Sequence, residues 1–153
     1  INGDASDDLH ATKDGTGRFA KLEVVVTEGQ YAKRKFFLQY MLATARKGAD
    51  AEGHIKAIDI SRSSLRSIVE AARGFAPTDE SDRAVAARKL KAISDLDGME
   101  FTGVIGIEKG TGGYQDRNTL KRVVPVGKAG EKKFDAAKEA ASMRAAPPSK
   151  QGW

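Results

Sequence analysis

GQYAKRKFFLQYML, residues 29–42, joins a tight turn to a strand that is both basic and aromatic. Before it, apolar residues alternate with other residues from Leu22 to Val26, which predicts a strand with one buried face. Gly29 lies between the two segments, and glycine tolerates the positive φ that a hairpin turn often needs. We therefore expect an antiparallel hairpin whose second strand covers residues 33–42.

The two faces of this second strand differ in character because successive side chains point to opposite sides. One face holds Arg34, Phe36, Leu38, Tyr40 and Leu42, and the other holds Lys33, Lys35, Phe37, Gln39 and Met41. The first set predicts core positions, and the second predicts a half-solvated face with one exposed ring. Phe37 is the aromatic residue we expect to stack on a base. The alternative is that Phe37 packs beneath the helices.

The rest of the chain predicts helices inserted between two pairs of strands. Helices are expected at 61–73 and 81–93, and two further strands at 99–107 and 118–124, joined by a glycine-rich tip at 110–114. Arg73-Gly74 is a C-terminal helix signal. Gly103 and Gly106 predict a bend or bulge in the third strand. This order predicts an α+β fold with an antiparallel β arrangement.

Composition limits the classes of function. The 153 residues carry a formal net charge of +5, and residues 31–125 hold 17 basic and 12 acidic side chains. This balance favours a polyanionic partner. The chain has no cysteine and two histidines, so we expect no metal site and no cofactor. No serine has an evident histidine partner, and we predict that the protein is not an enzyme.

Cations and rings outside the hairpin complete the candidate interface. The loop from Lys109 to Arg117 offers the Tyr114 ring and the Arg117 guanidinium, although a plain glycine-rich turn with local packing of Tyr114 is the alternative. Lys121 and Arg122 lie on opposite faces of the last strand. The residues predicted to contact nucleic acid are Lys33, Arg34, Lys35, Phe37, Tyr114, Arg117, Lys121 and Arg18.

Several short motifs resemble those of a known family. They are Thr16-Gly17-Arg18, Leu22-Glu23-Val24-Val25-Val26, Gly29-Gln30-Tyr31-Ala32-Lys33-Arg34-Lys35-Phe36, the helix end Ala71-Ala72-Arg73-Gly74, and Leu96-Asp97-Gly98-Met99-Glu100-Phe101. With Tyr114, Asn118 and Pro125, this pattern is similar to phage and prophage single-stranded DNA-binding proteins of formerly unknown function. The resemblance covers roughly residues 12–126.

The resemblance implies an OB-like antiparallel β-barrel with a two-helix insertion, and a role in phage DNA replication, recombination or repair. It implies binding of single-stranded DNA with little sequence preference, in the cytoplasm of an infected bacterial host. Ala32 stands where the family usually has glycine. The family's first strand has no counterpart before Ile1, so we expect the chain to begin inside the domain.

Residues 1–126 are therefore expected to form one OB-like nucleic-acid-binding domain. Residues 127–153 are rich in alanine and lysine, and we expect a flexible or partner-docked tail that contacts phage replication or recombination proteins. An adaptor that recruits a recombinase or polymerase is the alternative function, and a nuclease is a third. No segment predicts a membrane span, and assembly into a homo-oligomer stays open.

Overall fold

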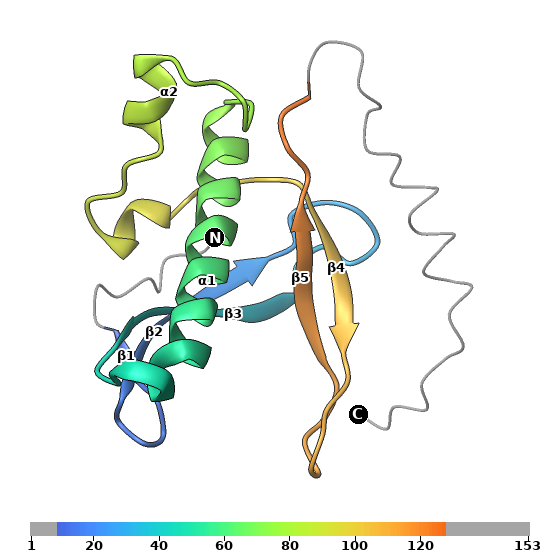
Figure 1. Ribbon diagram of the computed structural model, residues 1–153. Coiled ribbons are helices and arrows are strands. Elements are labelled where there is room, and N and C mark those ends of the chain that lie inside the picture. Colours follow the sequence, from blue (N-terminus) through green and yellow to red (C-terminus); the bar gives the residue numbers. More distant parts are fainter. Residues whose placement is uncertain (1–8, 128–153) are drawn as a thin grey trace.

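The computed structural model describes residues 9–127, which form an α+β fold with two antiparallel sheets and one long helix (Figure 1). One sheet has the order β1 (His10–Ala11), β2 (Gly17–Val25) and β3 (Lys35–Thr44), and the other pairs β4 (Gly103–Glu108) with β5 (Arg117–Val123). Between β3 and β4 come η1 (Gly48–Ala51), α1 (Glu52–Arg73), α2 (Asp82–Ala87) and η2 (Ile93–Leu96). The predicted order of two strands, two helices and two strands is confirmed, whereas β1, η1 and η2 were not predicted. Apart from Gly127, the predicted tail lies outside the described residues.

The β2–β3 hairpin confirms the pairing predicted from sequence, with Leu22 opposite Leu38 in antiparallel register. Its second strand begins at Lys35, two residues later than predicted, because the turn is longer. Lys33 has a positive φ of 70°, and its N–H donates to the Val26 carbonyl over 2.7 Å. Lys33 therefore belongs to the turn and does not continue the row of outward side chains on β3.

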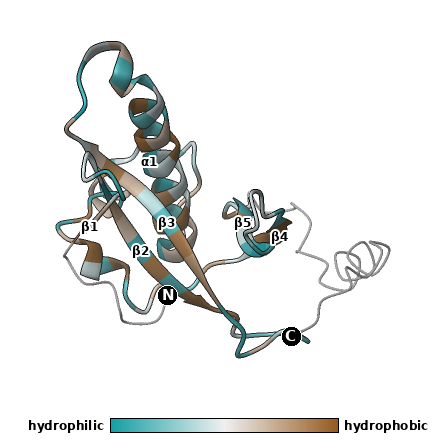
Figure 2. Cartoon of the chain, turned by 90° about the horizontal axis from the view of Figure 1, so that it is seen from below, coloured by the Kyte–Doolittle hydropathy of each residue, from teal (hydrophilic) through white to brown (hydrophobic). Residues whose placement is uncertain are grey.

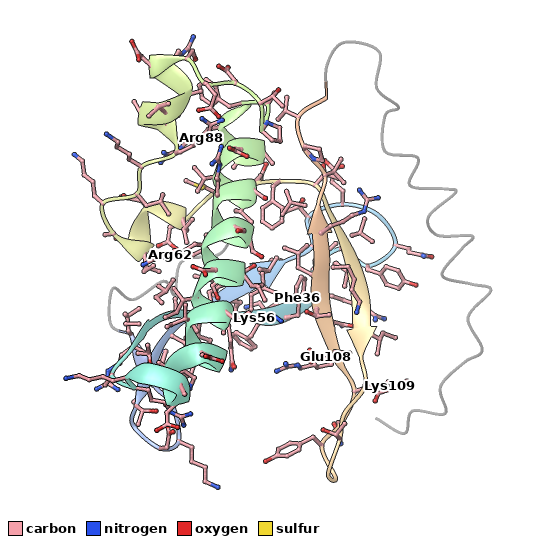
Figure 3. The ribbon with its side chains drawn as sticks, in the orientation of Figure 1. Phe36, Lys56, Arg62, Arg88, Glu108 and Lys109 are labelled. Atoms are coloured by element: carbon pink, nitrogen blue, oxygen red, sulfur yellow. The ribbon has the colours of Figure 1, made fainter. Side chains whose placement is uncertain are left out.

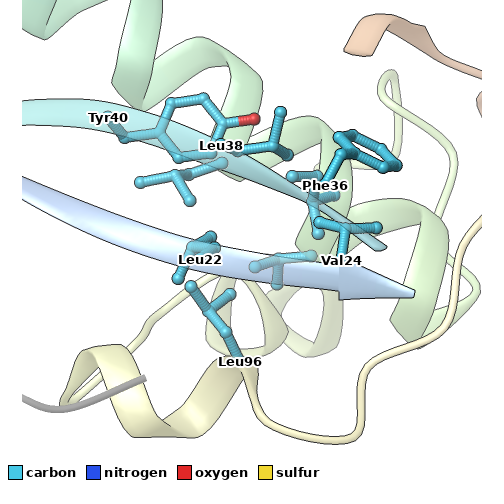
Figure 4. Packing of buried hydrophobic residues seen from close by; sticks show 9 residues of the cluster. Leu22, Val24, Phe36, Leu38, Tyr40 and Leu96 are labelled. Carbon is cyan, nitrogen blue, oxygen red and sulfur yellow. The ribbon is translucent and has the colours of Figure 1, made fainter. Parts of the chain in front are cut away.

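The core lies between the inner face of this hairpin and α1. Figure 4 shows Phe36, Leu38 and Tyr40 on the same side of the sheet as Leu22, with Leu96 of η2 packed nearby. Leu65, Ile68 and Val69 of α1 complete the buried cluster from the helix side. The prediction that Phe36, Leu38 and Tyr40 are core residues is therefore confirmed.

The first helix is longer than predicted and the second is shorter. α1 begins at Glu52, nine residues before the predicted start, because η1 leads directly into it in place of a side-chain cap. It ends as predicted, with Gly74 in the left-handed conformation at φ 78°. α2 stops at Ala87, well short of residue 93, although the Ser81 side chain caps its start by accepting from the Ala84 N–H.

The short second helix has a tertiary cause. Arg88 follows α2 directly, and its guanidinium donates to Glu70 on α1 and to the carbonyls of Ala76 and Pro77. Figure 3 places Arg88 between the α2 segment and α1. These contacts hold the chain against α1 at the point where the sequence periodicity favours further helix.

The β4–β5 hairpin lies beside the first sheet and does not pair with it in the described part of the chain. Its register shifts between Val104 and Ile105, which confirms the irregularity predicted from the neighbouring glycines. Figure 2 shows β4 and β5 almost end-on, next to the obliquely running β2 and β3. Across residues 9–127 the strands therefore form two separate sheets and not a closed barrel. Within the same residues no helix is both long and apolar enough to cross a membrane.

Tyr40 gives a prediction about alkaline pH. Burial raises the pKa of its phenol from 10.0 to about 12, so folding favours the neutral form. This contribution is complete below pH 10 and is lost as the pH rises toward 12. We expect roughly 1–3 kcal/mol of stability to disappear across that window. Urea unfolding at pH 9 and pH 11.5 measures it, and Tyr40→Phe should lose less than the wild type between the two pH values.

Candidate nucleic-acid interface

The outward face of the β2–β3 hairpin carries an exposed ring between two lysines. Phe37 is 51% exposed, so the alternative that it packs beneath the helices is wrong. The Lys21 ammonium lies 4.4 Å from the centroid of the Phe37 ring, a cation–π contact. Lys35 lies on the same side of β3, and its Nζ is 2.8 Å from a carboxylate oxygen of Glu23. A ring with cations beside it can stack on a base while the cations meet phosphates.

The same face continues toward β1 through a second aromatic pair. The rings of His10 and Phe19 are stacked with their centroids 5.5 Å apart, and Phe19 lies opposite Met41. Sequence reasoning placed Lys21 opposite to the buried face of the first strand but assigned neither Lys21 nor Phe19 to the interface. The signal was present, since both alternate with the buried residues of the first strand.

A groove opens at the edge of β3, between α1 and β5, and we call it the α1–β5 groove. It has a volume of about 440 Å³ and is lined by β3 from Phe37 to Tyr40, by α1 through Ile60 and four serines, and by β5 from Arg117 to Val123. Three cations line it, namely Arg117, Lys121 and Arg122, and none of the described residues that line it is acidic. The groove can therefore accept a polyanion without repulsion from a carboxylate in its wall.

Unpaired strand edges add polar groups to this groove. Within the described residues β3 pairs only with β2, and β5 pairs only with β4, so neither strand is paired on its groove side. Backbone N–H and C=O groups on such an edge need partners from water or a ligand. Gln39, Asn118 and Thr119 add side-chain amides and a hydroxyl nearby.

Arg117 and Lys121 are held in different ways. The Arg117 Nε donates to Glu108 over 2.9 Å, a hydrogen bond that raises the pKa of the guanidinium and lowers the pKa of the carboxyl. Lys121 lies across Gly106 on the neighbouring strand, where an added Cβ would come within 2.5 Å of its Cε. The lack of a side chain at Gly106 therefore leaves room for the lysine stem.

Tyr114 lies at the tip of the β4–β5 hairpin and is 82% exposed, so the alternative of local packing is wrong for this ring. The loop below it is held by Asp116, which accepts from the Lys109 ammonium over 2.7 Å and from the Gly110 N–H over 3.0 Å. These hydrogen bonds lower the pKa of the Asp116 carboxyl. Tyr114 is not among the residues that line the α1–β5 groove.

The remaining predicted residues lie at the two ends of the first sheet. Arg34 precedes β3, and its guanidinium lies 4.9 Å from the Tyr31 ring centroid. Arg18, near the start of β2, donates to the Gly15 and Gly17 carbonyls. Lys33 is in the β2–β3 turn. The structure thus brings Phe37, Arg117 and Lys121 together, with Lys35 beside Phe37, and leaves Arg18, Lys33, Arg34 and Tyr114 outside the groove.

Sequence reasoning assigned no binding role to the α1 serines that line the groove. Ser63, Ser64 and Ser67 have a helical spacing that places them on one side of α1, so a signal for a shared face was present. The sequence pattern does not show that β5 lies opposite this face of α1. In residues 9–127 no group of three or more histidine, aspartate or glutamate side chains is placed to hold a metal ion.

Comparisons with models of protein families, with curated proteins and with solved structures found no match for this chain.

Proposed function

We propose that this protein binds single-stranded DNA with little sequence preference, in phage DNA replication, recombination or repair. The observation that carries the proposal is the α1–β5 groove, which is lined by Phe37, Arg117 and Lys121 and by no acidic side chain among the described residues. These residues come from segments far apart in the sequence. A ring for stacking and cations for the phosphates are the two features that sequence-tolerant binding of single strands requires.

The exposed sheet face extends the proposed interface beyond the groove. Lys21 and Lys35 flank Phe37, so a strand leaving the groove meets two more cations on the hairpin. Binding to a phosphate requires Lys35 to leave Glu23 and Arg117 to leave Glu108. Arg117 and Glu108 are both exposed, and exposed ion pairs contribute little to stability, so releasing Arg117 costs little. Lys35 is exposed but Glu23 is only 19% exposed, so releasing Lys35 costs more. The same proposal includes an OB-like fold, in which the β2–β3 and β4–β5 hairpins lie around α1.

The proposal predicts how charge removal changes the salt dependence of binding. Lys121→Ala and Arg117→Ala should each weaken binding to oligo-dT and reduce the slope of log K against log salt by about 0.7 for each lost phosphate contact. Fluorescence anisotropy with a labelled 16-mer at several salt concentrations measures both quantities. Arg62→Ala removes the same charge from the exposed side of α1 away from β5 and is the matched control (Figure 3). Equal slopes for all variants would contradict the assignment of Arg117 and Lys121.

A further inference from the structure

The two walls of the α1–β5 groove have different chemistry. On the β5 side the lining includes Arg117, Lys121 and Arg122, whereas α1 contributes serines and Ile60 and no charged side chain. A strand of nucleic acid also has one charged side and one uncharged side, since its phosphates lie along one side and its bases along the other. The groove therefore favours one orientation of a bound strand.

The α1 wall presents hydroxyl groups to the groove. Ser63 is exposed, Ser67 is half-buried, and the two lie about one helical turn apart. Ser67 donates its hydroxyl to the Ser63 carbonyl over 3.0 Å, which leaves the Ser67 oxygen able to accept. The Ser63 hydroxyl has no hydrogen-bond partner within residues 9–127 and can both donate and accept.

We propose that a single strand in this groove lies with its phosphates against β5 and its bases against α1, where the Ser63 and Ser67 hydroxyls bind base edges. This inference rests on the proposed function and adds the orientation of the strand and the residues that meet the bases. Phe37 also lines the groove, but its side chain lies on the face of β3 opposite to the core residues that pack on α1, so a base stacked on its ring and a base bound at α1 lie on the two sides of the β3 edge.

Hydroxyl contacts explain two properties of the proposed binding. A serine hydroxyl rotates to suit either a donor or an acceptor, so it accepts the edge of any base and imposes little sequence preference. In the proposed orientation the hydroxyls meet the base edges that pair in a duplex, so the contact is open only to unpaired bases. The α1 wall would therefore select single strands over duplex DNA without selecting a sequence.

The test compares the double variant Ser63→Ala/Ser67→Ala with the wild type on two oligomers of equal length and charge, oligo-dT and an oligomer of abasic sugars. Each measurement uses the full chain at low salt. We expect the variant to bind oligo-dT roughly three- to tenfold more weakly per lost hydrogen bond, and to bind the abasic oligomer as well as the wild type does. Thr27→Ala removes an exposed hydroxyl outside the groove and should change neither affinity.

Two results would overturn the orientation while leaving the proposed function intact. The first is a double variant that binds oligo-dT as tightly as the wild type does. The second is a loss of the same size on both oligomers, since this would place the serines against the backbone. A wild type that fails to bind oligo-dT at all would instead overturn the proposed function, and the orientation with it.

Discussion

Glu70→Gln is expected to lower the free energy of unfolding by about 3 kcal/mol, the usual cost of removing one partner from a buried ion pair. Glu70 is 4% exposed, and one of its oxygens lies 2.6 Å from Arg88 and 2.8 Å from Arg66. Arg66 is half exposed and can turn to water, but Arg88 is almost buried. The substitution therefore leaves the Arg88 charge in the protein interior without its partner.

Urea unfolding followed by circular dichroism measures this effect. Glu80→Gln is the matched control, because Glu80 is 71% exposed and lies 3.7 Å or more from the same two arginines. We expect the control to unfold at nearly the wild-type urea concentration. A Glu70→Gln variant as stable as the control would show that Arg88 finds another partner or reaches water, and that Glu70 does not hold the α2 segment on α1.

Phe37→Ala is expected to weaken binding to oligo-dT by about 1–3 kcal/mol, which corresponds to roughly five- to 150-fold in affinity. The ring is half exposed and is not part of the buried core, so its removal should leave the fold intact. The variant also ends the contact with the Lys21 ammonium. Anisotropy titration measures the affinity, and thermal unfolding checks that stability is retained.

Tyr31→Ala is the control for Phe37, since Tyr31 is another exposed ring beside a cation but lies in the β2–β3 turn, away from the groove. We expect its affinity to stay close to that of the wild type. Phe37→Leu keeps an apolar side chain without a ring and should behave like Phe37→Ala. If Phe37→Leu binds as the wild type does, the contact is not base stacking.

Local patterns were sufficient to predict the hairpin and its core. The alternation from Leu22 onward and the paired faces of the second strand predicted which of Phe36, Phe37 and Tyr40 would be buried. Gly74 marked the end of α1 because a left-handed residue is needed there. In each case the signal and the structure that it specifies lie within a few residues of one another.

Boundaries set by distant contacts were missed. The second helix was predicted to reach residue 93, but Arg88 binds Glu70, which is 18 positions away in the sequence. The barrel was expected from a family resemblance, and in residues 9–127 the two hairpins do not pair to close it. Pairing between separate sheets depends on the relative position of whole elements, which a sequence pattern does not contain.

The candidate site shows the same division. Phe37 was identified from strand alternation, Arg117 as a cation of the predicted hairpin loop, and Lys121 as a cation on the last predicted strand. Their convergence with the α1 serines depends on how β5 lies against α1 and β3, so the groove itself was not predicted. Lys33 was assigned to the strand because its positive φ has no signature in a non-glycine residue.

Titration of the full chain with fluorescently labelled oligo-dT, and with a duplex of the same length, tests the central claim most directly. We predict preferential binding to the single strand, with an affinity that falls linearly on a plot of log K against log salt as counterions are released. Undetectable binding, binding that does not change with salt, or a preference for the duplex would contradict the account.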